Sequence, residues 1–332
     1  MEKYFIWVQK TTERQLTKRL QRIAREKALK AQKKTLKGEL FSWLDAIVFA
    51  VVFVLLINQY IFQLFMIPTP SMVETLLVKD RVFVSKTAYG VEMYPGGPKL
   101  LSDRVPLRDD VIVFYNPEYE SRGPVFDVLS QMIYMATFSL VNIDVDEDGN
   151  MRERLYVKRA AALGGDTIRF ENGAASIRGA GQKSFIDDTT FREENSLASS
   201  PHQSLDASLY PGIKAYGKLL AYQDKDLSSA APRHVVQTYQ QVADYRGIVD
   251  YYAVEQSRTA TLSHLEPHNL SYRSSAARYE MGIYVPHGYV LPLGDNRDNS
   301  HDGRYFGPMS TDSIIGRVRF KFWPLNRIGG VS

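Results

Sequence analysis

Residues 46–57 read AIVFAVVFVLLI, a run without a single polar side chain. This run is the centre of a longer apolar stretch, Phe41 to Ile67, in which Asp45 is the one charged residue. A helix needs ~20 residues to cross the ~30 Å of hydrocarbon in a bilayer. We therefore expect residues 41–67 to form a single transmembrane helix.

Two other interpretations apply to the same stretch. A buried helix of a soluble protein has a similar composition. A removable secretory signal is disfavoured, because the run starts only near residue 41, is too long, and has no small-x-small cleavage pattern at its end. The membrane anchor is the interpretation carried forward.

Charge is distributed unevenly along the chain. Residues 1–40 hold twelve Lys and Arg against four Glu, whereas the whole chain of 332 residues has a formal net charge of +4. Because positive segments stay on the cytoplasmic side, we expect residues 1–40 in the cytoplasm and the chain from Pro68 onward on the opposite face of the cell membrane. Residues 15–36 lack Gly and Pro and favour a helix, either solvated or lying on anionic lipid headgroups. No nucleic-acid module accompanies this basic region.

Composition excludes several chemistries. The chain contains no cysteine, so disulfides, thiolate catalysis and Cys-based zinc sites are absent. None of the acidic or histidine clusters has the spacing of metal ligands, and we expect no metal or organic cofactor.

A second apolar stretch, residues 125–143, is interrupted by Asp127, Ser130 and Gln131. It favours an amphipathic or buried helix over a second membrane span.

Beyond Pro68 the pattern changes to short strands separated by Gly, Pro and Asp clusters. The runs that read as strands are 81–85, 111–114, 155–158, 167–170, 289–291 and 318–322. We expect a mainly β fold, with an antiparallel β catalytic body in two parts, residues 68–170 and 281–332. Residues 171–280 are polar and carry no sharp motif, and are interpreted as an insertion or cap with some helix near 235–254.

Ser71 follows the apolar stretch within the run IPTPSM, residues 67–72. A serine hydroxyl is a poor nucleophile until a base takes its proton. Lys158 is one candidate base, because it lies in a strand-like segment on the same face as Tyr156 and Ala160. A lysine that acts near neutral pH must lose its charge, which burial in an apolar pocket favours.

Histidine is the other candidate base. The chain has six histidines, namely His202, His234, His264, His268, His287 and His301. A Ser-His-Asp triad is therefore open on residue count, although no G-x-S-x-G elbow supports it.

Four segments, in order, resemble the sequence boxes of type I signal peptidases, the membrane-bound Ser-Lys proteases that remove signal peptides. The first is residues 67–72, followed by Thr75, Leu76 and Asp80. The others are 110–114 with Pro117, 156–159 with 165–168, and 294–304. The resemblance covers roughly residues 60–118, 154–170 and 285–324, and leaves out the insertion.

The resemblance implies a role for each matching residue. Ser71 would be the nucleophile and Lys158 the general base. The Thr69 hydroxyl and the Ser71 backbone N–H would stabilise the oxyanion. Ser300 would hold the lysine amine in place. The remaining supports would be Asp295 paired with Arg159, and Asp302 paired with Arg304. Pocket walls for small substrate side chains would come from Phe65, Ile67, Leu76, Tyr156 and Val157.

The chain also departs from the family pattern. Lys79-Asp80 and Asp109-Asp110 stand where the family usually has Gly-Asp, and Gly303 replaces a usual serine. We expect these changes to alter turn geometry and to remove one supporting hydroxyl. Because every proposed catalytic group is retained, we expect activity at an altered rate.

The function implied is a membrane-anchored serine endopeptidase that cleaves signal peptides from exported preproteins through a Ser71 acyl-enzyme. Its partners would be signal-peptide-bearing preproteins, the lipid bilayer and the export translocon, with no nucleic acid. One alternative is a catalytically dead anchored module that binds exported chains. Another is a self-cleaving regulator of the LexA-like type, disfavoured by the anchor and by the lack of a DNA-binding module.

Overall fold

The computed structural model describes residues 2–32, 36–100, 104–137, 140–149, 151–197 and 201–331. Residues 1, 33–35, 101–103, 138–139, 150, 198–200 and 332, which fall in the predicted segments 1–40, 68–170, 171–280 and 281–332, lie outside the described residues. The chain divides into two compact units, residues 1–55 and 56–332. The first unit holds helix α1 (Glu2–Gln32), which confirms the expected helix in the basic region, and most of α2.

Helix α2 (Leu36–Tyr60) contains the apolar stretch, and its part Glu39–Tyr60 is long and apolar enough to cross a membrane. At 1.5 Å per residue its 22 residues extend roughly 33 Å. The helix was expected to reach Ile67, but it ends at Tyr60. Residues Phe62–Met66 instead form strand β1, whose backbone groups pair antiparallel with β2 (Arg81–Ser85). A partner strand far along the chain thus decides where the helix stops.

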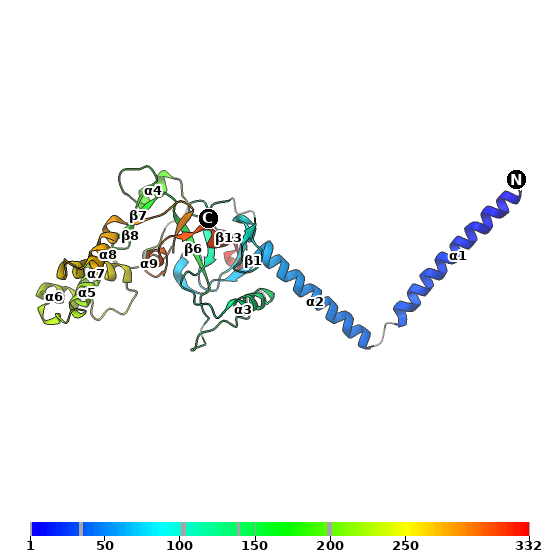
Figure 1. The fold of residues 1–332 in the computed structure, drawn as a ribbon, viewed down its shortest axis with the longest axis horizontal. Helices are drawn as coiled ribbons and strands as arrows, with labels where there is room; N and C mark the ends of the chain where they lie inside the picture. Colours follow the sequence, from blue (N-terminus) through cyan, green and yellow to red (C-terminus); the bar gives the residue numbers. More distant parts are fainter. Residues whose placement is uncertain are drawn as a thin grey trace. The chain divides into compact units, whose positions relative to one another are not determined.

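Antiparallel β-sheets form the body of the second unit, as the sequence predicts (Figure 1). The main sheet has the order β1-β2-β13-β5-β6-β11-β12, with β14 paired to β13. Its further strands are β5 (Val111–Tyr115), β6 (Leu155–Leu163), β11 (Tyr289–Leu293), β12 (Met309–Ser310), β13 (Ile314–Trp323) and β14 (Gly329–Gly330). A second sheet has the order β10-β7-β8-β9, from β10 (Ile283–Tyr284), β7 (Thr167–Glu171), β8 (Ala174–Arg178) and β9 (Ile186–Asp187). A short pair joins β3 (Val91–Glu92) to β4 (Lys99–Leu100).

Helix is more abundant than the sequence analysis expected. The insertion holds α4 (Asp188–Glu194), α5 (Tyr210–Gln223), α6 (Arg233–Gln240), α7 (Tyr251–Leu265) and α8 (Leu270–Met281). The helix expected near 235–254 is divided between α6 and α7. The boundary placed at residue 170 falls inside the second sheet, because β7 pairs with β8 across it. Outside the insertion lie α3 (Pro124–Ala136), which agrees with the expected helix in 125–143, and α9 (Gly303–Phe306).

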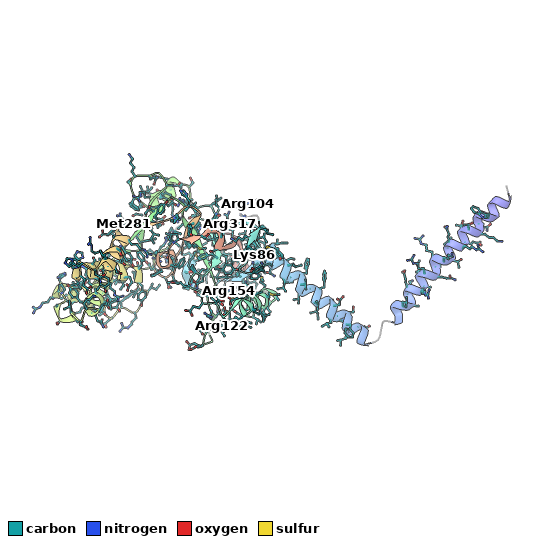
Figure 2. The ribbon with its side chains drawn as sticks, in the orientation of Figure 1. Lys86, Arg104, Arg122, Arg154, Met281 and Arg317 are labelled. Carbon is teal, nitrogen blue, oxygen red and sulfur yellow. The ribbon has the colours of Figure 1, made fainter. Side chains whose placement is uncertain are left out.

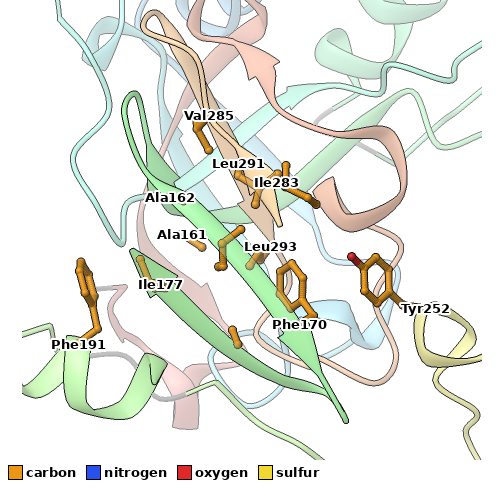
Figure 3. Packing of buried hydrophobic residues seen from close by; sticks show 12 residues of the cluster. Ala161, Ala162, Phe170, Ile177, Phe191, Tyr252, Ile283, Val285, Leu291 and Leu293 are labelled. Carbon is orange, nitrogen blue, oxygen red and sulfur yellow. The ribbon is translucent and has the colours of Figure 1, made fainter. Parts of the chain in front are cut away.

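The core that fixes the central strand β6 lies between the two sheets (Figure 3). Ala161 and Ala162 of β6 pack there against Leu291 and Leu293 of β11, with side chains from β7, β8 and α7. Full burial of one such large apolar side chain stabilises a fold by about 1.5–3 kcal/mol. Small residues on β6 allow the second sheet to approach closely, and the strand that carries Lys158 is buried along residues 158–162.

Three turns of the β body share one construction. Asp80, Asp110 and Asp166 each accept a hydrogen bond from the backbone N–H three residues earlier, at 2.8, 2.9 and 2.7 Å. The residue before each of them has a positive φ: Lys79 at 73°, Asp109 at 71° and Gly165 at 97°. Left-handed backbone favours glycine. The two departures from the family's Gly-Asp therefore keep the turn geometry and place a side chain in a strained conformation.

Replacement of Lys79 by glycine should raise the free energy of unfolding by up to about 1 kcal/mol, because it relieves the left-handed strain. Thermal unfolding of the detergent-solubilised chain measures this change. Lys79→Ala is the matched control and should give no gain, since alanine keeps the Cβ atom. A lower midpoint for Lys79→Gly than for Lys79→Ala would contradict the explanation.

Candidate active site

The candidate nucleophile lies in a short turn of 3₁₀-helix, Pro70–Met72, directly after β1 and the loop that follows it. Pro70 fixes its own φ and starts the turn. Loop 294–304 holds the turn from the other side: the Asn296 N–H donates to the Ser71 carbonyl at 3.1 Å, and its side-chain amide donates to the Pro70 carbonyl at 3.2 Å. Ser71 is 7% exposed.

Lys158 lies on β6 opposite Ile112 of β5, and its side chain is buried. Its Nζ is 2.6 Å from Ser71 Oγ, so the two candidate catalytic groups are in hydrogen-bond contact. Burial lowers the pKa of Lys158 to about 8, opposed by the attraction of its ammonium to Asp302. A protonated amine donates to the serine hydroxyl, whereas a neutral amine accepts its proton. The second arrangement is the one that activates a nucleophile.

Asp302 and Arg304 form a buried pair behind the lysine. Arg304 Nε donates to Asp302 Oδ1 at 2.9 Å, and the Gly294 N–H donates to Asp302 Oδ2 at 2.9 Å. Burial alone would raise the pKa of Asp302, but the Arg304 charge and these hydrogen bonds outweigh it and lower the pKa. Asp302 therefore stays ionised, and the pair supplies a fixed field near Lys158.

Arg159 and Asp295 form a second buried pair. The Arg159 guanidinium donates two hydrogen bonds to the Asp295 carboxylate, at 2.8 and 2.7 Å. Thr75 Oγ1 donates to Asp295 at 2.6 Å. The Asp109 carbonyl accepts from Arg159 at 2.8 Å. This cluster joins the lysine strand to loop 294–304 and to the chain just after Ser71.

Asp109 also explains how the insertion connects to the site. Its carboxylate accepts hydrogen bonds from Arg192 of α4 at 2.8 and 3.0 Å and lies 4.0 Å from Arg159. Arg192 in turn donates to Asp188, which pairs with Arg297. The family's usual glycine at position 109 offers no carboxylate to such an arginine. Sequence analysis missed this link, since Arg192 lies in the segment without motifs.

Two supporting residues are placed near the nucleophile without the contacts expected of them. Thr69 Oγ1 lies 3.4 Å from Ser71 Oγ. Ser300 is buried, but its hydroxyl has no hydrogen-bond partner among the described residues, and no bond to Lys158 is formed. A Cβ at Gly294 would lie 2.2 Å from Ser300 Oγ and 2.6 Å from the Ser71 carbonyl oxygen, so only glycine fits there.

No histidine contacts the nucleophile in the described part of the chain. The partners of Ser71 Oγ there are Lys158 and Thr69. His301 lies nearest in sequence to the site residues, but its ring stacks on Tyr305 and pairs with Glu118 at 2.5 Å. The geometry therefore favours lysine over histidine as the base.

A pocket of about 450 Å³ opens beside the nucleophile turn. One part of its wall comes from residues 65–69, and another from residues 151–157, which include the start of β6. Residues of α3 also line it. Of the five predicted pocket residues, Phe65 and Val157 line it. Ile67 and Leu76 lie in the hydrophobic core with Met72, and Tyr156 packs against Phe114 and Phe306.

Sequence analysis missed the contribution of α3 to this pocket. Ser130, Gln131 and Tyr134 of α3 line it, together with Asn142 and Asp144. The available signal was the set of polar residues that interrupts the apolar stretch 125–143. A second pocket, of about 430 Å³, lies against α5 and α6 in the insertion and contains none of the predicted site residues.

Comparison with known proteins gives a family match over most of the chain. A sequence model of the family described as "Signal peptidase, peptidase S26" matches residues 40–323. The signal peptidase I of Haemophilus influenzae is 25% identical over 289 residues, which cover 84% of this chain and 68% of its own length. That of Aquifex aeolicus is 26% identical over 270 residues, covering 80% and 77%, and that of Helicobacter pylori is 23% identical over 295 residues, covering 86% and 81%.

Proposed function

Because the chain belongs to the signal peptidase family, peptidase S26, we propose that it is a membrane-anchored serine endopeptidase that cleaves signal peptides from exported preproteins with a Ser71–Lys158 pair. The observation that carries the proposal is the 2.6 Å contact between Lys158 Nζ and Ser71 Oγ in a buried setting. A desolvated amine next to a hydroxyl is the arrangement needed for a base at neutral pH.

The proposed reaction has two halves. Neutral Lys158 takes the proton of Ser71 as its Oγ attacks the scissile carbonyl. The resulting ammonium then protonates the leaving amine, and an acyl-enzyme forms. Neutral Lys158 next activates water, which attacks the ester and releases the signal peptide. The Ser71 N–H and the Thr69 hydroxyl would stabilise the oxyanion, and one such donor is typically worth ~3 kcal/mol.

The substrate would bind as an extended strand beside β1 and residues 155–158 of β6. Among the strands of the described residues, β2 is paired with β1, and β5 is paired with residues 155–158, because β11 begins pairing at Arg159. Strand edges of this kind can bind a peptide strand. Phe65 and Val157 would then meet alternate side chains and limit their size.

The proposed placement puts residues 1–40 in the cytoplasm and the unit 56–332 on the extracytoplasmic face of the cell membrane. The excess of Lys and Arg before the apolar helix supports this orientation. A substrate would be a preprotein whose signal segment occupies the same bilayer, delivered by the translocon.

The test of this proposal is the pH dependence of kcat/KM for cleavage of a preprotein with an Ala-x-Ala site. Only neutral Lys158 is active, so the rate should rise about tenfold per pH unit below the pKa of about 8 and level off above it. Ser71→Ala gives the background. Thr69→Val is the control, and should lower the plateau without moving the midpoint. A flat profile through the neutral range would exclude Lys158 as the base.

A further inference from the structure

Helix α3 buries three polar side chains, whereas three of its apolar side chains, Val125, Leu129 and Met132, are exposed and Met135 is buried. Asp127, Ser130 and Gln131 are 8%, 3% and 7% exposed. Val125 is 81% exposed and Leu129 50% exposed. A helix on the surface of a soluble body normally has the reverse arrangement.

The inward polar face is fixed by specific hydrogen bonds. Asp127 accepts from Ser121 Oγ at 2.5 Å and from Tyr119 OH at 3.2 Å. Arg154 donates to the Asp127 carbonyl at 2.6 Å. A rotation of α3 that buried Leu129 would break these bonds and leave a carboxylate in an apolar environment, which is costly. The outward position of the apolar side chains is therefore built into the fold.

The apolar residues form a stripe. Val125, Leu129 and Met132 recur at i, i+4 and i+7, which places them on one side of the helix. Leu140 and Val141, just beyond it, are also exposed. Single exposed apolar residues are ordinary, whereas a group on one face indicates an interaction surface.

The position of α3 in the unit indicates lipid as the occupant. Tyr134 of α3 packs on Phe65 of β1, with 6.4 Å between ring centroids. Phe65 follows Tyr60, the last residue of the apolar helix, by five residues, a reach of at most about 17 Å in a strand. Tyr60 belongs to the same compact unit and donates to the Met93 carbonyl at 2.9 Å. A bilayer entered at Tyr60 is therefore within reach of α3.

We propose that α3 lies on the bilayer, with Val125, Leu129 and Met132 inserted among the acyl chains. The inference rests on the membrane anchoring in the proposed function. Arg122, two residues before the helix, is exposed, and its guanidinium lies 5.5 Å from the Phe126 ring, on the α3 side of the unit (Figure 2). One of its nitrogens donates to the Val145 carbonyl at 2.5 Å. The remaining donors of an arginine at that place can bind lipid phosphates.

Such docking has a consequence for the substrate. The inward face of α3 lines the pocket beside Thr69, through Ser130, Gln131 and Tyr134. One helix thus touches lipid on one side and the substrate groove on the other. The groove would lie at the membrane surface, where a signal peptide leaves the bilayer.

The absence of cysteine makes a direct test practical. Leu129→Cys and Leu140→Cys are labelled with a nitroxide in the full chain, reconstituted in vesicles of phosphatidylcholine and phosphatidylglycerol. Leu270→Cys on α8 is the matched control, because Leu270 is an equally apolar residue that is 75% exposed. We expect collision with dissolved oxygen to exceed collision with a water-soluble nickel chelate several-fold at Leu129 and Leu140. The reverse is expected at Leu270.

Two results would overturn the proposal. Equal access of the nickel chelate to Leu129 and Leu270 would place α3 in water. Shielding of Leu129 from both reagents, with dipolar broadening between labels, would assign the stripe to a second copy of the chain. Neither result depends on proteolysis, since the measurement works equally in the Ser71→Ala background, and a failure here leaves preprotein cleavage to be judged by its own assay.

Discussion

Replacement of Ser71 or Lys158 by alanine should each reduce preprotein cleavage by at least ~10⁴-fold, because the two residues act as one unit. The serine supplies the atom that attacks, and the lysine, 2.6 Å away, supplies the only base in contact with it in the described chain. Lys158→Arg should be equally inactive, since a guanidinium does not give up its proton near neutral pH. Steady-state cleavage of an Ala-x-Ala preprotein in detergent micelles measures the loss.

A measurement of the free energy of unfolding distinguishes a variant that has lost a catalytic group from a variant that has lost its fold. The pKa of Lys158 is about 8 in the folded chain, below its value of 10.5 when exposed. Burial of the ammonium therefore destabilises the fold at neutral pH, and this cost disappears as the pH rises from about 8 to 10.5. Lys158→Met should accordingly be more stable than the wild type at pH 7, with a gain that shrinks above pH 8. An inactive variant that is also less stable at pH 7 would point to misfolding.

The second large effect concerns the buried ion pair. Replacement of Asp295 by alanine should lower the free energy of unfolding by about 3–5 kcal/mol, because it leaves the Arg159 guanidinium buried without its carboxylate. Arg159 and Asp295 are both 1% exposed, so water cannot take the place of the lost partner. Denaturant unfolding of the solubilised chain, followed by tryptophan fluorescence, measures the change.

Asp224→Ala is the matched control for this experiment. Asp224 pairs with Arg258 at 2.6 Å, but both side chains are about one third exposed, and the loss should stay below about 1 kcal/mol. Similar losses for the two variants would mean that the buried pair contributes no more than a surface pair. Asp295→Asn, which keeps the shape and loses the charge, should fall between them.

Most residues of the candidate site could be predicted from the sequence, because each of them lies within a short, recognisable sequence motif. Ser71 follows the apolar stretch, Lys158 stands in an alternating strand, and Asp295, Asp302 and Arg304 occupy one loop. The strands expected at 81–85 and 111–114 agree with the structure within a residue, whereas the strand expected at 155–158 extends to Leu163. Alternation indicated the first and the third, because a half-buried strand alternates, and a short apolar run indicated the second. The order of residues along the chain could not show that the Ser300 hydroxyl has no hydrogen-bond partner among the residues that the structure describes.

Contacts between distant segments account for what the sequence left undecided. The apolar stretch runs to Ile67, yet the helix ends at Tyr60. Residues 62–66 instead pair through their backbone groups with β2, about twenty residues further along the chain. Ile67 and Leu76 are apolar and near Ser71 in the sequence. In the structure both are buried in the hydrophobic core with side chains of β1, β5 and β13, so they do not line the pocket.

The sequence by itself determined the helix that is long and apolar enough to span a membrane, the charge asymmetry, the β pattern and the candidate catalytic pair, because composition, periodicity and short motifs are properties of neighbouring residues. Only the tertiary structure decided the orientation of α3, the link from Arg192 through Asp109 to Arg159, and which walls the pocket has. The physical reason is that burial is a property of the folded whole: an amphipathic helix specifies two faces, and the partners packed against it decide which of them meets water, protein or lipid.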